Sequence, residues 1–176
     1  MLFSSYDFIF IFLPFVLIFS SFLSKNKNLF IVFLIFSSFL FYLYGLPHYI
    51  FLLTSLLIFN YLASKFLNLF QDTFNRKLLL YFSIILNISI LFYYKYSNFF
   101  IQNFNYIYDD FFRLNHDLIL PLGISFFTFQ QIGYLIDIYY KKHQTLSLTK
   151  YFFFVSFFPQ LIVGPIMKCS HFIKQI

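Results

Sequence analysis

The sequence predicts an all-α membrane protein, a polytopic bundle of transmembrane helices. Of its 176 residues 61% are hydrophobic and only 10% are charged, and the mean hydropathy is +0.79. A soluble domain of this length could not bury so much apolar surface. The apolar residues also fall into separate runs divided by polar or proline-containing turns. We therefore expect about six membrane segments within one domain, residues 1–176.

Residues 8–24 predict the first segment. No basic region precedes it and no small-residue cleavage site follows, so we expect a retained span and not a signal peptide. Residues 29–44 and 49–62 predict a closely joined pair, because glycine and proline break the helix between them. These runs are short for the ~17 to 25 residues that a span needs. The polar residues 68–77 are expected to separate this pair from the next span.

Residues 78–94 predict the fourth span, with Asn87 at its midpoint. An unpaired amide is costly in lipid, so we expect Asn87 to bond an adjacent helix. Residues 95–117 mix aromatic side chains with asparagine and aspartate. This pattern is too polar to cross the bilayer, and we expect it to lie at the interface.

Residues 120–139 predict the fifth span, which Pro121 and Gly123 break near its start. Helical steps of about 100° per residue place five residues on one face: Phe126, Gln130, Gly133, Tyr134 and Asp137. An amide and a carboxylate within a span normally face protein or water and are functional candidates. In the alternative interpretation Gln130 only bonds a neighbouring helix and Asp137 only pairs with Lys141.

Residues 151–167 predict the sixth segment, interrupted at Pro159-Gln160 and at Gly164-Pro165. Two prolines and a glycine within this short stretch cannot continue an undisturbed helix. At membrane depth, broken backbone is tolerated only against protein or a water-filled cavity. We therefore expect residues 158–166 to line an interior space or to re-enter from one side. The alternative is a helix that ends at Phe158 and continues into a short surface loop.

The basic residues predict the orientation in the membrane. If six segments alternate, one side carries eight of them: Lys25, Lys27, Lys65, Arg76, Lys77, Lys141, Lys142 and Lys150. The other side carries four: Lys95, Arg113, Lys168 and Lys174. The positive-inside rule then puts the richer side in the cytoplasm and the N-terminus outside.

Other classes of function find little support in the sequence. The net charge of +6 comes from short basic clusters between apolar runs, so membrane topology accounts for it and no nucleic-acid partner is expected. The single cysteine, Cys169, excludes an internal disulfide and predicts no metal site. No phosphate loop, nucleophile elbow or zinc-protease motif is present. The histidines stand apart, and we expect solvated or interfacial positions for them: His48, His116, His143 and His171.

Two motifs resemble one family. The stretch LPLGISFFTFQ at residues 120–130, followed by YLID at residues 134–137, closely resembles a signature of the membrane-bound O-acyltransferases of the alginate O-acetylase type. The stretch FFPQLIVGPI at residues 157–166 resembles the second signature of the same group, and Phe172 and Gln175 continue it. Weaker agreement extends the resemblance over nearly the whole chain.

The resemblance implies an enzyme of the bacterial inner membrane that transfers an acyl group, usually acetyl, to hydroxyls of an exported polymer such as alginate or peptidoglycan. It implies an acyl donor, acetyl-CoA or an acyl carrier, and no bound cofactor. In the peptidoglycan branch it also implies a periplasmic acetyltransferase partner. Gln130, Asp137 and Gln160 become candidates for lining the substrate path.

The sequence departs from the family in one respect. The family's catalytic base is a histidine in a Trp-His-Gly context, downstream of the second signature, whereas this sequence contains no tryptophan and ends at Ile176. We therefore expect the N-terminal part of an acyltransferase domain without its catalytic part, assign no catalytic residue, and expect the chain alone to be inactive unless the missing half or a complementary fragment is supplied. The alternatives are a non-catalytic membrane subunit or pseudoenzyme remnant, and a transporter-like membrane protein.

Overall fold

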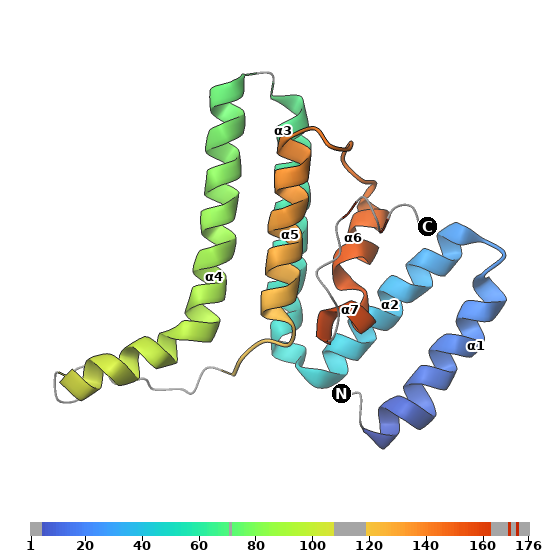
Figure 1. Cartoon of the computed structure of the whole chain (residues 1–176). Coiled ribbons are helices and arrows are strands. Elements are labelled where there is room, and N and C mark those ends of the chain that lie inside the picture. The colour runs from blue at the N-terminus through green and yellow to red at the C-terminus, as the bar shows by residue number, and fades with distance from the viewer. Residues whose placement is uncertain (1–4, 71, 108–118, 163–168, 170–171, 173–176) are drawn as a thin grey trace.

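The structure is a computed structural model that describes residues 5–70, 72–107, 119–162, 169 and 172. Every regular element within these residues is helical, which confirms the all-α class (Figure 1). In chain order they are a π-helix Phe8–Phe12, α1 (Leu13–Leu23), α2 (Lys27–Gly45), a 3₁₀ turn Pro47–Tyr49, α3 (Ile50–Leu69), α4 (Thr73–Ile107), α5 (Ile124–Tyr139), α6 (Leu148–Ser156) and α7 (Phe158–Ile162).

Short polar or special residues set the helix boundaries. Asn26 adopts extended backbone before α2, and its Oδ1 accepts hydrogen bonds from the next two free backbone N–H groups, as an N-cap asparagine does. Asp72 caps α4 in the same way through the N–H of Phe74, at 3.1 Å. Gly123 precedes α5 with φ 68°, a left-handed conformation that favours glycine. The sequence thus specifies where these helices begin.

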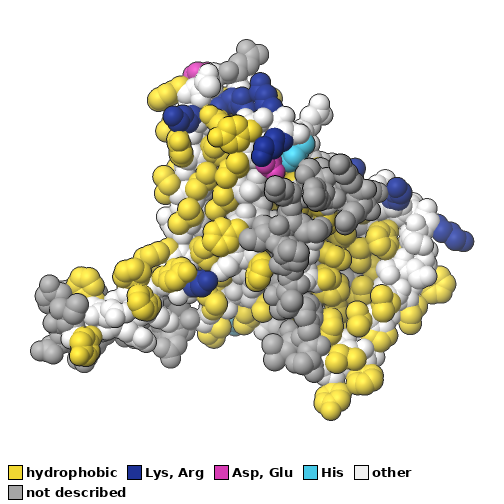
Figure 2. Space-filling model, in the orientation of Figure 1, with side chains coloured by type: hydrophobic (Ala, Val, Ile, Leu, Met, Phe, Trp, Pro, Cys, Tyr) yellow, Lys and Arg dark blue, Asp and Glu magenta, His cyan; other side chains and the backbone are white. Residues whose placement is uncertain are grey.

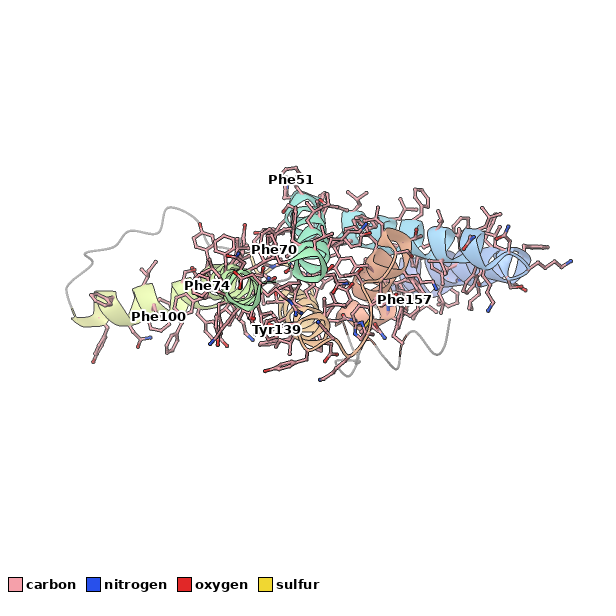
Figure 3. The ribbon with its side chains drawn as sticks, turned by 90° about the horizontal axis from the view of Figure 1, so that it is seen from above. Phe51, Phe70, Phe74, Phe100, Tyr139 and Phe157 are labelled. Atoms are coloured by element: carbon pink, nitrogen blue, oxygen red, sulfur yellow. The ribbon has the colours of Figure 1, made fainter. Side chains whose placement is uncertain are left out.

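The helices form a flattened row. In Figure 1, α3 and α5 lie at the centre, α4 flanks them on one side, and α2, α6 and α7 lie on the other, with α1 at the edge. The contacts agree, since α5 packs on α3 and α4, and α2 packs on α1, α6 and α7. The view from above shows the same order (Figure 3).

Three described helices are long and apolar enough to cross a membrane: Lys27–Gly45, Pro47–Leu69 and Thr73–Phe104. Phe8–Leu23 is a shorter apolar helix. Many large apolar side chains are exposed on the described helices, and Figure 2 shows hydrophobic patches on the visible face. In Figure 3, Phe51 projects outward from α3. Such a surface is suited to lipid. The protein is an integral membrane protein with a helical bundle fold.

Two predicted boundaries were wrong. The polar residues 68–77 do not form a separate linker, because α3 continues to Leu69 and α4 already begins at Thr73. The reason is that Asp72 caps α4 so early that only residues 70–72 remain between the helices. Residues 95–107 are also helical and extend α4, and this end of α4, which carries Phe100, bends away from the bundle (Figures 1 and 3). Their location at the interface stays a prediction.

The sixth segment is broken earlier than expected. Helix α6 ends at Ser156, Phe157 has ψ 111°, and α7 starts at Phe158 with Pro159 in its first turn, where proline is tolerated. Phe158 is buried, and its N–H donates to Ser38 Oγ of α2 at 3.1 Å. The alternative of a helix ending in a surface loop at Phe158 is therefore wrong.

Some predictions fall outside the described residues. These include the second half of the expected re-entrant stretch, residues 163–166. They also include six residues for which the sequence makes a prediction: Arg113, His116, Lys168, His171, Lys174 and Gln175. Expectations for these positions stay predictions.

Candidate functional site

Three amides and a phenol from four helices meet inside the bundle. They are Asn60 of α3, Asn87 of α4, Gln131 of α5 and Tyr151 of α6, which we call the amide cluster. Each side chain is at most 1% exposed. The cluster joins segments that lie far apart in the sequence.

The amide cluster is held by a continuous set of hydrogen bonds. Asn60 Nδ2 donates to Asn87 Oδ1 at 3.1 Å and to Gln131 Oε1 at 2.7 Å, while Asn87 Nδ2 donates back to Asn60 Oδ1 at 2.8 Å. The Tyr151 hydroxyl donates to Gln131 Oε1 at 3.1 Å. The expectation that Asn87 bonds an adjacent helix is confirmed.

The chemistry of the three amides suits positioning and not proton transfer. Amide–amide bonds between helices in a membrane contribute about 0.6 to 2 kcal/mol each, so the cluster fixes α3, α4, α5 and α6 against one another. Amides do not titrate, and general base catalysis needs a group that does. The three amides therefore shape the interior without supplying a base.

One polar atom of the Gln131 side chain makes no hydrogen bond to the described residues. Its Nε2 is buried and has no hydrogen-bond partner among the residues that the structure describes, as is also true of Thr128 Oγ1 on the same helix and Tyr42 OH on α2. A buried donor without a partner costs about 1 to 3 kcal/mol, and such a group requires an explanation. A hydrogen-bond acceptor placed beside Gln131 Nε2 would therefore be stabilised.

Gln130 and Gln160 lie together beside the break in the sixth segment. Gln130 is 7% exposed, and its Nε2 donates to the carbonyl of Phe154 in α6 at 2.8 Å and to Gln160 Oε1 in α7 at 3.5 Å. Gln130 thus bonds a neighbouring helix, as the alternative interpretation expected. It also links α5 to α6 and to α7, which lie on either side of the break. A role for either glutamine in the substrate path stays a prediction.

Asp137 lies near the end of α5 and pairs with a different lysine from the one expected. Its Oδ1 accepts from Lys142 Nζ at 2.8 Å, and His143 Nε2 lies 4.0 Å from Oδ2. The alternative prediction that Asp137 pairs with Lys141 was wrong, because Lys141 has φ 56° and turns the chain where the helix ends. A helical i to i+4 pair cannot continue past that turn.

The predicted polar face of α5 was partly wrong. Gly133 is exposed, and a Cβ added there would meet no atom within 4 Å. The most buried stripe instead follows Ile124, Phe127, Gln131, Leu135 and Ile138. These residues repeat at helical spacing of three and four, and that repeat is the signal that identifies Gln131, which our sequence analysis missed.

The two described histidines lie outside the amide cluster. His48 is exposed in the 3₁₀ turn between α2 and α3, and His143 lies in the loop after α5 beside Asp137. Among the residues that the structure describes, no group of three His, Cys, Asp or Glu side chains is arranged to hold a metal ion.

Comparison with known proteins supports the resemblance. The chain is 35% identical to a peptidoglycan O-acetyltransferase of Helicobacter pylori, in an alignment that covers 86% of the chain. It is 33% identical to a probable alginate O-acetylase of Pseudomonas aeruginosa and 31% identical to that of Azotobacter vinelandii, each over 99% of the chain. No family model and no solved structure matches. The chain spans about a third of the length of these curated relatives.

These matches cover nearly all of the chain, including both motifs and the helices that carry the amide cluster. Their names agree with the group that the two motifs resemble. The chain belongs to the membrane-bound O-acyltransferase family, in its alginate O-acetylase-like branch.

Proposed function

We propose that the chain forms part of an O-acyltransferase of the bacterial inner membrane, which transfers acetyl groups to hydroxyls of an exported polysaccharide. The observation that supports this proposal is the similarity, over 86% to 99% of the chain, to proteins named for O-acetylation of peptidoglycan or alginate. The acceptor is a polymer of one of these two kinds.

In this proposal the described helices hold the wall of the acyl-transfer path. Transfer requires the donor thioester and the acceptor hydroxyl to be aligned within a fixed cavity. The amide cluster supports that alignment because it locks four helices together. The Gln130–Gln160 contact would keep the broken segment in place beside them.

The reaction also needs a base for the hydroxyl proton. The oxygen attacks the acyl carbon, the donor leaves as a thiolate that takes up a proton, and the acceptor becomes an ester. The polar side chains that the structure places in the interior are amides, hydroxyls and phenols. We propose that the base comes from a Trp-His-Gly segment of further protein, that the donor is acetyl-CoA or an acyl carrier, and that a periplasmic acetyltransferase completes the pathway if peptidoglycan is the acceptor.

The test is to express this chain with and without a fragment containing Trp-His-Gly, in cells that lack related acyltransferases. O-acetyl ester released from the exported glycans by mild alkali is then measured. Ester is expected only when both pieces are present, and it should disappear when the histidine of the added fragment is changed to alanine.

Other outcomes separate the alternatives. Ester formation by this chain alone would contradict the proposal, and its loss in His116→Ala or His171→Ala would locate a different base. Absence of ester, although both pieces are stably inserted and associate, would favour a non-catalytic subunit.

A further inference from the structure

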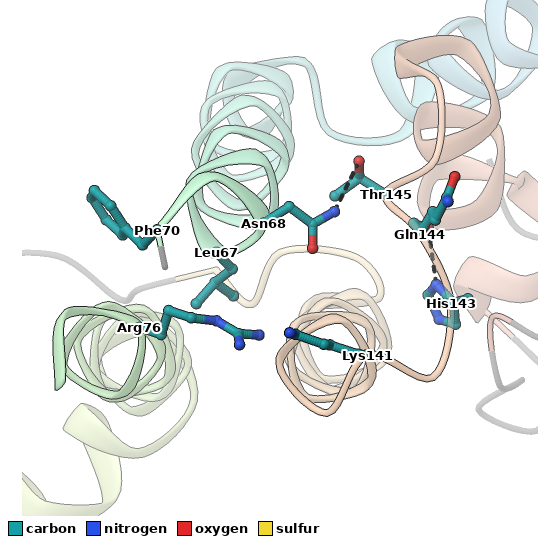
Figure 4. Close-up of a pocket in the computed structure, with 8 residues that line it drawn as sticks. All are labelled: Leu67, Asn68, Phe70, Arg76, Lys141, His143, Gln144 and Thr145. Carbon is teal, nitrogen blue, oxygen red and sulfur yellow. Dashed lines mark hydrogen bonds between the residues drawn. The ribbon is translucent and has the colours of Figure 1, made fainter. Parts of the chain in front are cut away.

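A pocket of about 650 Å³ opens at the end of the bundle where α3 ends and α4 begins. Figure 4 shows its lining, which comes from these two helix ends and from the loop after α5. The lining residues are Leu67, Asn68, Phe70, Arg76, Lys141, His143, Gln144 and Thr145. We call it the basic pocket. It is separate from the amide cluster.

Two positive charges point toward one another across the basic pocket. In Figure 4 the guanidinium of Arg76 and the ammonium of Lys141 face each other. Arg76 Nη2 donates to the carbonyl of Tyr139 at 2.7 Å, and the guanidinium lies 5.3 Å from the ring of that tyrosine. These contacts orient Arg76 but leave most of its N–H donors without a hydrogen bond to the described residues.

The backbone holds Lys141 in an unfavourable conformation. The N–H of Lys141 bonds the carbonyl of Ile138, and the N–H of Lys142 bonds that of Asp137. This is the Schellman pattern, whose left-handed position is usually glycine. Lys141 occupies it with φ 56°. A side chain at such a position costs conformational energy, and such strain clusters at functional sites.

Two described carboxylates, at the ends of α4 and α5 that border the basic pocket, are already engaged. Asp137 pairs with Lys142, and Asp72 accepts from Phe74 N–H and from Asn75 Nδ2 as the cap of α4. Neither carboxylate lies within ion-pair distance of Arg76 or Lys141 in the described chain. Like charges that converge without a counter-ion repel each other, and an anion between them would remove that repulsion.

We propose that the basic pocket binds a phosphate group. The planar guanidinium of Arg76 can bond two phosphate oxygens at once, and the ammonium of Lys141 adds a point charge. Asn68 and Thr145, which bond each other at 3.4 Å across the pocket, offer further donors. The phosphate belongs either to an anionic lipid headgroup or to a soluble phosphate compound. This inference does not depend on the proposed acyl transfer.

The test uses Cys169, the sole cysteine of the sequence, which is buried. A thiol-reactive fluorescent dye reports its exposure as the chain is heated in a maltoside detergent, which carries no phosphate. Pyrophosphate should raise the unfolding midpoint in a saturable manner, while sodium chloride of equal ionic strength should not. The half-saturating concentration should rise about tenfold or more in Arg76→Gln and in Lys141→Gly, because each loses a charge-assisted contact.

Two variants serve as controls for misfolding. Lys141→Gly removes the ammonium and also relieves the left-handed backbone, so it should fold at least as well as the parent. Lys77→Gln removes a neighbouring charge of α4 that does not line the basic pocket, and its response to pyrophosphate should match that of the parent. Equal responses in Lys141→Gly, Lys77→Gln and the parent would overturn the proposal.

Lipid nanodiscs distinguish the two sources of phosphate. If the ligand is a lipid, phosphatidylglycerol should stabilise the parent more than phosphatidylcholine does, Lys141→Gly should lose that difference, and pyrophosphate should then add nothing. If the ligand is soluble, pyrophosphate should stabilise the parent equally in both lipids. The absence of any effect from either pyrophosphate or phosphatidylglycerol would overturn the proposal.

Discussion

Asn60 and Asn87 face each other between α3 and α4 and exchange two hydrogen bonds, of 3.1 and 2.8 Å. Each amide also donates to a carbonyl of its own helix, four residues earlier. The pair is therefore satisfied on both sides, and it links directly to Gln131 of α5.

The first prediction concerns the exchange itself. Asn87→Leu leaves Asn60 Oδ1 buried without its partner, which should lower the free energy of unfolding by about 1 to 3 kcal/mol. Asn60→Leu should cost more, because it also removes the contact with Gln131. The double variant should cost less than the sum of the two, since the second change removes a group that is already unpaired.

The measurement for this prediction is the unfolding midpoint from dye labelling of Cys169, analysed as a double-mutant cycle. Ser89→Leu is a matched control, because Ser89 lies on the exposed side of α4. Strict additivity of the two asparagine changes would show that the reciprocal bonds contribute nothing.

The second prediction compares two adjacent serines of α2. Both are buried and both donate to a carbonyl of their own helix, but only Ser38 also accepts from Phe158 N–H, at the start of α7. Ser38→Ala should therefore destabilise the chain by about 1 to 3 kcal/mol through the orphaned N–H. Ser37→Ala is its control and should cost clearly less. Equal unfolding midpoints for the two variants would contradict the contact.

The third prediction separates Gln131 from Gln130. Gln131→Leu removes the acceptor of both Asn60 and Tyr151 and should lower the amount of folded protein more than Gln130→Leu does. In the complemented acyltransferase assay, a Gln130→Leu variant that acts only as a helix contact should lose activity in proportion to folded protein. A greater loss per folded molecule would instead support a place in the substrate path.

Asp137→Leu is tested in the same way. This variant loses the ion pair with Lys142.

The fourth prediction is topological. A reporter cysteine at Leu46 should react with an impermeant thiol reagent in intact cells, and one at Asn75 only after permeabilisation, because the basic residues place the start of α4 in the cytoplasm. Cys169 should give little background, since it is 2% exposed. Labelling with the opposite sidedness would invert the predicted orientation.

The fifth prediction concerns pH. Burial, and secondarily the charge of Asp137, raises the pKa of the Cys169 thiol from 9.0 to about 12. The folded chain therefore holds this proton more tightly than the unfolded chain, so the stability is fully present below about pH 9 and is lost as the pH rises toward 12. Calorimetric unfolding should show a steeper decline above pH 9 for the parent than for Cys169→Ala. Parallel declines would show that the thiol titrates normally.

The sequence by itself determined the helical membrane class and the approximate bounds of α1, α2 and α5, because these depend on local properties. Apolar runs give spans, Asn26 and Asp72 can cap a helix using only nearby backbone, and Gly123 supplies a left-handed turn before α5. The expected bond of Asn87 to another helix also followed from the cost of an unpaired amide in lipid.

Only the tertiary structure decided which side chains meet. Asn60, Asn87, Gln131 and Tyr151 are separated by many residues, and their contact depends on the relative rotation of four helices. A shift of one residue on α5 exchanges Gln130 for Gln131, since neighbouring positions differ by about 100° around a helix. The pairing of Asp137 with Lys142, and the approach of Lys141 to Arg76, likewise depend on a left-handed turn. Helix packing and chain reversal act over distances that local sequence preferences do not encode.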